Sequence, residues 1–286
     1  MKVGLMFANV GPFGLPDHLE RLARICDEVG VESLWTVEHV VVPKGYQSEY
    51  PYSPSGKMPG PEESPIPDPV LPLAFAAAVT EKLRFGTGVL ILPQRHPAYV
   101  AKEMATLDVL SGGRAMLGVG IGWLREEFET LGIPFEERAP RTEESIRAIR
   151  SLWGEPAPFE GRFYRWGAVE SNPKPVQEGG VPILVGGHVE GAARRAARVG
   201  DGFFPAGGEP RTLEPLLQAM HDECGKTGRD PAEIEISAGT TKTDPDTLRA
   251  LAGLGVSRIA IGPPAFDPEG LRKALGDVVE LAAKLS

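Results

Sequence analysis

Hydrophobic residues divide the chain into two alternating kinds of segment. Compact apolar runs predict strands that are buried on both faces, and longer stretches with apolar residues three and four positions apart predict helices. The predicted strands are residues 3–8, 33–37, 83–92, 115–119, 182–185, 202–204, 234–238 and 258–262. The predicted helices are residues 15–30, 68–79, 97–111, 141–153, 189–199, 212–227, 245–254 and 268–285, with a short helical piece at 126–131.

Strict alternation of strands and helices predicts parallel strands joined by right-handed crossovers. Eight such pairs within 286 residues favour an α/β fold with a single (β/α)₈ TIM barrel domain over residues 1–286. The alternative is a doubly wound open sheet, which usually has about five to seven strands. Two long insertions, residues 43–67 and 154–180, follow the second and fourth strands. Both are expected to fold over the barrel opening.

Composition indicates an ordinary globular protein, with 42% hydrophobic and 24% charged residues. The formal charge of −9 argues against nucleic-acid and anionic membrane partners. The N-terminal apolar run is too short for a signal peptide, and the chain contains no apolar stretch of membrane-spanning length, so a cytoplasmic location is expected. Cys26 and Cys224 are expected to be buried thiols, and the sequence shows no metal-ligand cluster.

A glycine-rich turn follows the fourth predicted strand, at Gly118, Gly120 and Gly122. Without side chains, these residues let the backbone approach a bulky or anionic cofactor. Their spacing resembles a phosphate loop but matches neither the dinucleotide fingerprint nor the Walker sequence. Close packing of strand and helix is the alternative explanation.

Functional groups of a barrel lie at the carboxyl ends of its strands, so the residues there predict one mouth. His39 follows Glu38 at the end of the second strand. Its ordinary pKa suits proton transfer at neutral pH, although a structural role is the alternative. His188 is either a phosphate ligand or a neighbour of a helix cap. The basic helix face formed by Arg194, Arg195 and Arg198 is either a solvated surface or a contact to an anionic cofactor.

The run HPAYVAKEMATLDVLSGGRAMLGVGIGWLREEFETLGIPFEER, residues 96–138, resembles the luciferase-like monooxygenase superfamily of flavin and deazaflavin barrel enzymes. It is similar to the actinobacterial branch usually assigned to coenzyme F420. Further similar segments are GTGVLILP, GRFYR, NPKPVQ, PILVGG and RRAARVGDGFFP, which begin at residues 86, 161, 172, 182 and 194. The resemblance covers nearly the whole chain.

The resemblance implies roles for residues of the mouth. Glu38 and His39 match an acidic-histidine pair that touches the cofactor, with His39 at the redox ring or the substrate. The peptide between Gly88 and Val89 matches a non-proline cis bond behind the ring. The remaining implied cofactor contacts are Gly120, Ile121, Gly122, Gly186, Gly187 and His188.

The chain departs from the sugar-phosphate dehydrogenases of the superfamily at Trp123, where those enzymes place a catalytic glutamate. Trp123 is therefore expected to form an aromatic wall of a substrate pocket to which Asn9 also contributes. Arg125, Glu126 and Glu127 are weaker polar candidates.

These observations predict an oxidoreductase that transfers a hydride between coenzyme F420 and a small organic substrate, with His39 and Glu38 as catalytic residues. One alternative is an FMN-dependent monooxygenase that activates dioxygen, and another is a non-catalytic flavin-binding protein. A barrel lyase or aldolase would need a Schiff-base lysine or metal carboxylates at strand ends, which the sequence does not show. The resemblance also implies a homodimer.

Overall fold

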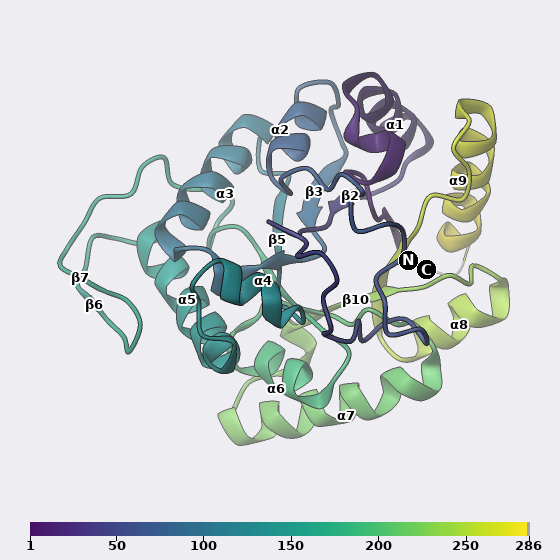
Figure 1. Ribbon diagram of the computed structural model, residues 1–286. Coiled ribbons are helices and arrows are strands. Elements are labelled where there is room, and N and C mark those ends of the chain that lie inside the picture. Colours follow the sequence, from purple (N-terminus) through teal and green to yellow (C-terminus); the bar gives the residue numbers. More distant parts are fainter. Residues whose placement is uncertain (285–286) are drawn as a thin grey trace.

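Parallel strands close into a barrel inside a ring of helices in the computed structural model, which describes residues 1–284 (Figure 1). Around the barrel the order is β1 (Lys2–Leu5), β2 (Ser33–Thr36), β3 (Arg84–Thr87), β5 (Ala115–Gly120), β8 (Ile183–Gly186), β9 (Gly202–Phe204), β10 (Glu235–Gly239) and β11 (Val256–Ile261). The pairing of β11 with β1 and of β3 with β5 leaves no open edge. The predicted (β/α)₈ barrel is confirmed, and the doubly wound alternative was wrong.

Helices follow the strands and cover the outside of the barrel. The major ones are α1 (Pro16–Val29), α2 (Leu71–Ala77), α3 (Pro97–Ser111), α5 (Arg138–Trp153), α6 (Glu190–Val199), α7 (Pro210–Thr227), α8 (Pro245–Gly253) and α9 (Pro268–Ala283). The short α4 (Arg125–Thr130) and four 3₁₀ turns (Gly11–Gly14, Leu92–Gln94, Phe135–Glu137 and Pro231–Glu233) lie between them. Left-handed glycines end α1, α3 and α7, as glycine permits. The predicted end of the last helix, Leu285, lies outside the described residues.

The predicted strand 83–92 is divided in two. Residues Arg84–Thr87 form β3, and Leu90–Ile91 form β4, which pairs with the end of β5. Between them the Gly88–Val89 peptide is cis, as the resemblance implied. The apolar run is continuous through the break, so its periodicity could not reveal it.

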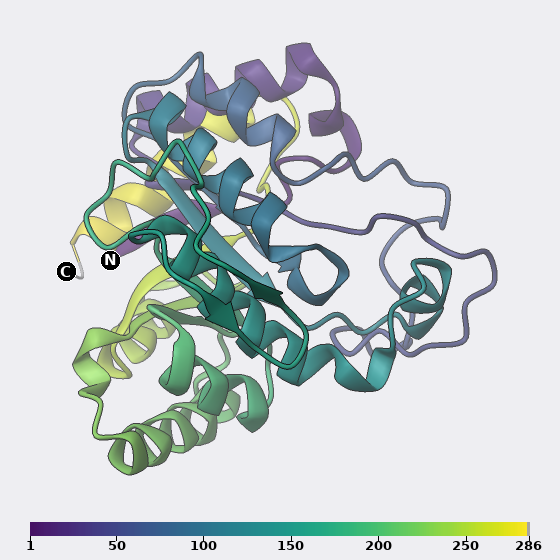
Figure 2. The ribbon, with the colours of Figure 1, turned by 90° about the vertical axis from the view of Figure 1, so that its left-hand side faces the viewer.

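The second insertion does not fold over the barrel opening, and that expectation was wrong. It contains the antiparallel strands β6 (Phe159–Glu160) and β7 (Arg165–Trp166) and lies outside α3 and α5 (Figure 2). Glu144 of α5 accepts hydrogen bonds from the amides of Phe163 and Tyr164, and Asp108 of α3 accepts one from Val176. The insertion leaves from the carboxyl end of α5, at the end of the barrel opposite the mouth, and this sets its course.

The first insertion does cross the barrel mouth. Residues 43–67, hereafter the lid, pass in front of the strands in Figure 1 and lie beside α4, on the side away from both termini, in Figure 2. Beneath the mouth, Trp35 and Phe204 meet edge to face inside the barrel, with ring centroids 4.9 Å apart. Trp35 fills space left by Gly86, where an ideal Cβ would lie 2.3 Å from its ring. The barrel interior is therefore solid below the mouth.

Two findings concern the wider setting of the barrel. Cys26 and Cys224 are buried free thiols, as expected, and burial raises the pKa of both. Within residues 1–284 we find no helix that combines the length and apolar character needed to cross a membrane.

Candidate functional site

His39 lies at the mouth in contact with a buried carboxylate. Its Nδ1 is 3.0 Å from Oε2 of Glu127, a fully buried residue of α4, and the His39 side chain is only 8% exposed. Oε1 of Glu127 accepts hydrogen bonds from the amides of Val40 at 2.6 Å and Val41 at 3.2 Å. Since an ionised carboxylate only accepts, this geometry assigns the proton to Nδ1. Nε2 is then the ring nitrogen available for proton transfer, with no hydrogen-bond partner among residues 1–284.

The neighbouring glutamate of α4 holds the lid. Glu126 accepts hydrogen bonds from the amide of Gln47 at 2.7 Å and the hydroxyl of Ser48 at 2.6 Å. Desolvation alone raises the pKa of Glu126, but the hydrogen bonds from Ser48 and Gln47 outweigh it and lower the pKa to about 2. Consecutive glutamates therefore fix the lid and His39 to one short helix. The sequence marked Glu126 and Glu127 as polar candidates without indicating these partners.

Glu38 belongs to a buried ion pair with Arg95, and its carboxylate is not hydrogen-bonded to His39. Its Oε2 accepts a hydrogen bond from the amide of Ile91 in β4 at 2.5 Å, and its Oε1 accepts one from Nε of Arg95 at 2.8 Å. Nη2 of Arg95 also donates to Asp68 at 2.9 Å. Burial raises the pKa of Glu38, and the charge of Arg95 acts against that rise. Because Glu38 holds the segment beside Gly88 and Val89, the geometry favours a positioning role over contact with a ligand.

Asn9 differs from its predicted role in a substrate pocket, because it is fully buried. Its Nδ2 donates to the carbonyls of Val37 and Pro67, each at 2.8 Å, and its Oδ1 accepts from the amide of Val37 at 2.9 Å. These bonds join the ends of β1, β2 and the lid. Asn9 therefore holds the backbone around the mouth together, and its side chain has no polar atom left for a ligand.

Val89 lies at the mouth between the ends of β5 and β8, where it is half-buried. An ideal Cβ on Gly120 or on Gly186 would lie 2.5 Å from one of its methyl groups, so both positions must be glycine. Close packing around Val89 therefore explains why these two positions are glycine. Close packing was also the alternative explanation of the glycine-rich turn in the sequence. The result is a small apolar surface at the strand ends, which fits the face of a flat ring.

Free backbone donors adjoin this surface. The amides of Gly122 and Trp123 have no protein acceptor within residues 1–284. Gly122 has φ 78°, and an ideal Cβ there would meet the ring of Phe128 at 2.7 Å. By contrast, the amide of Gly187 donates to the carbonyl of Phe204 at 3.3 Å. An apolar surface beside free amides fits a flavin or deazaflavin, which carries carbonyl groups and an anionic tail.

His188 borders a second part of the mouth. With Ala206, Gly207 and lid residues 51–54, it lines a pocket of about 430 Å³. Its Nδ1 accepts a hydrogen bond from the amide of Gly207 at 3.3 Å. Burial lowers the pKa of His188, so the imidazole is neutral at neutral pH.

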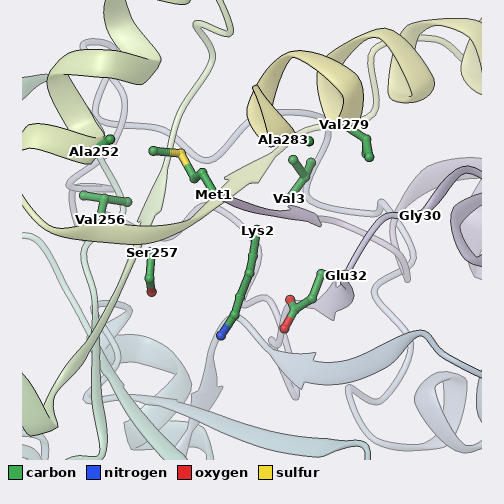
Figure 3. A pocket seen from close by; sticks show the side chains of 10 residues that line it. All are labelled: Met1, Lys2, Val3, Gly30, Glu32, Ala252, Val256, Ser257, Val279 and Ala283. Atoms are coloured by element: carbon green, nitrogen blue, oxygen red, sulfur yellow. The ribbon is translucent and has the colours of Figure 1, made fainter. Parts of the chain in front are cut away.

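A larger pocket, of about 760 Å³, lies at the opposite end of the barrel, where Lys2 and Glu32 extend along its edge (Figure 3). Lys2 is paired with Glu235, and Glu32 is paired with the fully buried Arg258. Since the active sites of these barrels lie at the carboxyl ends of the strands, we place the site at the mouth. Within residues 1–284, no group of His, Cys, Asp or Glu is arranged to bind a metal ion.

The basic face of α6 turns toward acidic side chains of the neighbouring helices. Arg198 is 2.6 Å from Glu143 and 2.7 Å from Glu223, and the buried Arg195 is 3.4 Å from Glu143. Arg194 pairs with Glu190 at 2.7 Å. These ion pairs account for the basic face without a cofactor.

Aromatic residues of the lid are the part of the site that the sequence missed. Tyr46, Tyr50 and Tyr52 come from a segment without a readable pattern, and two of them contact Trp123. Phe7, after β1, is also absent from the predicted set. It is 43% exposed and has φ 64°, an uncommon backbone conformation for a residue other than glycine.

Comparison with known proteins identifies the family. The model of the family described as luciferase-like monooxygenase matches residues 7–244. The barrel belongs to this family.

Relatives within this group carry different names. An uncharacterized protein of Mycobacterium tuberculosis is 36% identical over 245 residues, or 84% of this chain and 83% of that protein. The F420-dependent glucose-6-phosphate dehydrogenase of Nocardia farcinica is 32% identical over 240 residues, or 80% of this chain and 65% of that enzyme. Among solved structures, the monooxygenase RslO1 from Streptomyces bottropensis has a TM-score of 0.77 at 26% identity, covering 99% of each chain.

Proposed function

We propose that this chain is an oxidoreductase that transfers a hydride between the deazaflavin coenzyme F420 and a small organic substrate. The observation that carries the proposal is the pairing of His39 with the buried Glu127 beside the apolar surface of Val89. The F420-dependent relative from Nocardia farcinica supports this choice of cofactor.

The residues of the mouth divide the work of such a reaction. When bound, the deazaflavin supplies or accepts the hydride. Val89 would support its ring, and the amides of Gly122 and Trp123 would bind its polar groups. His39 would donate or accept the accompanying proton at Nε2, while Glu127 holds the imidazole in one orientation. The lid would exclude water.

An FMN-dependent monooxygenase is the second candidate. The fit to RslO1 over 99% of both chains favours it, because that protein is named as a monooxygenase. The same apolar surface and free amides would suit FMN. A non-catalytic flavin-binding protein is a third possibility, which predicts tight binding without turnover.

A parallel titration of the purified protein with F420 and FMN, followed by fluorescence at two ionic strengths, tests the cofactor. We expect F420 to bind at least about tenfold more tightly, a difference of about 1.4 kcal/mol. Preference for FMN would support the monooxygenase. Binding of neither would contradict both cofactor assignments.

His39→Ala tests the catalytic assignment, with His221→Ala, on the exposed face of α7, as the matched control. With a panel of small alcohols, aldehydes and ketones, we expect His39→Ala to lower kcat about 10²- to 10⁴-fold, because general acid–base catalysis is lost. The Kd for F420 should stay within about threefold. Tight binding without any turnover by the unaltered protein would favour the non-catalytic alternative.

A further inference from the structure

We infer, on the basis of the proposed function, that the substrate is uncharged and carries a flat apolar ring, which packs against an aromatic wall of the mouth. The wall consists of Trp123, after β5, and of the lid residues Tyr46, Tyr50 and Tyr52. This inference concerns the class of substrate and is separate from the choice of cofactor.

The rings of the wall form a continuous series of edge-to-face contacts. The Trp123 centroid lies 5.6 Å from that of His39, 5.5 Å from Tyr46 and 5.1 Å from Tyr50, and the Tyr50 centroid lies 5.4 Å from Tyr52. Trp123 and Tyr50 are half-buried, so each still presents ring surface. Aromatic surface beside the proton-transferring His39 favours a substrate with a ring of its own.

Two cationic side chains near the mouth, Arg95 and Lys57, are already held by protein partners. Arg95, in the floor, is held by Glu38 and Asp68. Lys57, in the lid, donates to the carbonyl of Tyr46 at 2.6 Å and lies 4.2 Å from the centroid of its ring. A charged substrate would lose its hydration here without gaining one of these ions as a partner, which is unfavourable.

The pocket beside Tyr52 is also lined by uncharged residues. Its lining residues are Pro51, Tyr52, Ser53, Pro54, His188, Ala206 and Gly207. All are uncharged, because burial keeps the imidazole of His188 neutral at neutral pH. A volume of about 430 Å³ accommodates a ring compound. The Nε2–H of His188 supplies a polar contact that could orient such a ligand, whereas the Ser53 hydroxyl is already bonded to Ser55.

The reaction balances for a ring-bearing carbonyl compound. In the reducing direction, the carbonyl carbon would gain a hydride from the reduced deazaflavin, and the carbonyl oxygen would gain a proton from Nε2 of His39. For this step His39 must start as the doubly protonated imidazolium, and it ends neutral, with its remaining proton on Nδ1 facing Glu127. The C=O double bond becomes a C–O–H single bond, the deazaflavin is oxidised, and His39 recovers its proton from solvent. The reverse steps oxidise the alcohol.

Calorimetric titration with matched probes tests the inference, on the protein alone and after addition of F420. The probes are benzaldehyde, 4-carboxybenzaldehyde, which adds one negative charge to the same ring, and glucose 6-phosphate. We expect benzaldehyde to bind at least about tenfold more tightly than either charged probe, or about 1.4 kcal/mol. Trp123→Ala should weaken benzaldehyde binding about tenfold, and Trp123→Phe should restore most of it.

Trp166→Ala is the matched control, because the ring contacts of Trp166 are with Phe159 and His96 and not with the aromatic wall. It should leave the Kd for benzaldehyde unchanged, and thermal melts would confirm that each variant folds. Equal binding of a charged probe, no effect of Trp123→Ala, or no binding of benzaldehyde would overturn the inference. Benzaldehyde binding that depends on Trp123, in a protein that does not bind F420, would contradict the proposed cofactor while supporting the wall.

Discussion

Glu127 determines which nitrogen of His39 faces the mouth. One oxygen of the carboxylate accepts a hydrogen bond from Nδ1 of His39. The other accepts hydrogen bonds from the amides of Val40 and Val41. A histidine held this way cannot rotate its ring without breaking a hydrogen bond in a buried place, where an unpaired polar atom costs about 1–3 kcal/mol. The orientation of His39 is therefore part of the folded state before any ligand arrives.

Replacing Glu127 by Gln should lower kcat about 10- to 100-fold, with a smaller change in the Kd of the cofactor. In either orientation of the new amide, its NH2 faces a donor, which is Nδ1 of His39 or the amides of Val40 and Val41, so the contacts that fix His39 are disrupted. Steady-state kinetics and cofactor titration measure the two effects separately. Glu129→Gln, on the exposed face of α4, is the control. An unchanged kcat for Glu127→Gln would remove the positioning role.

Individual residues show how far the sequence could be interpreted. His39 could be selected because it follows a strand end, a local feature of the chain. The partner of His39 could not, because Glu127 lies 88 positions away and reaches it only once the barrel has closed. Asn9 and Glu38 were assigned to the mouth for the same local reason. In the structure, hydrogen bonds to Val37 and to Ile91 show that both side chains hold the backbone around the mouth in place.

At the scale of elements, α4 links the lid to His39 at the mouth of the barrel. It is only six residues long, and its consecutive glutamates contact different parts of the chain. Glu127 holds the segment that enters the lid, and Glu126 holds Gln47 and Ser48 within it. Movement of α4 would therefore displace the lid and His39 together.

The anchoring of the lid by Glu126 should persist in mild acid. Its pKa is lowered from an ordinary value of about 4.3 to about 2 in the folded protein. The anchoring is thus complete above the ordinary pKa and is lost as the pH falls toward 2. Hydrogen exchange at the amides of Gln47 and Ser48, corrected for the intrinsic effect of pH, measures it.

Glu126→Gln should increase exchange at both lid amides at neutral pH, and Glu129→Gln should not, because Glu129 lies on the exposed face of α4. A transition in the unaltered protein centred near the ordinary pKa of a glutamate would show that these hydrogen bonds do not stabilise the ionised form in solution.

Elements that are periodic were predictable, and elements that depend on distant partners were not. Helices such as α3 begin at a proline and are followed by a glycine, so nearby residues alone indicate where they start and stop. The break between β3 and β4 leaves the apolar pattern intact. The course of residues 154–180 is set by Glu144 and Asp108, which belong to other elements. The lid and its tyrosines have no periodicity at all.

For the molecule as a whole, alternation of strands and helices was sufficient to predict the closed barrel. One helix departs from the usual pattern of a polar outer face. The residues of α2 are apolar on every side, and Leu71 and Phe75 are 72% and 41% exposed. A helix that is apolar all round normally has a partner on each side. We propose that α2 contributes to the interface of a homodimer.

Sedimentation should then give a mass of about twice 30.6 kDa. The double substitution Leu71→Glu and Phe75→Glu should shift it toward the single-chain mass, because two buried charges destabilise an apolar interface. Phe266→Glu, which alters an exposed aromatic residue just before α9, is the control. A single-chain mass for the unaltered protein would refute the dimer.

The floor and the cover of the mouth are separable parts of this barrel. The floor is fixed by backbone and glycine, since Val89 sits between Gly120 and Gly186 with no room for change. The cover is a loop tied down through α4 and, at its carboxyl end, by the hydrogen bond from Asn9 to the carbonyl of Pro67. Under the proposed function, exchange of residues 43–67 between relatives, with Glu126 and Glu127 retained, should therefore change which substrate is preferred without altering the floor that would hold the cofactor.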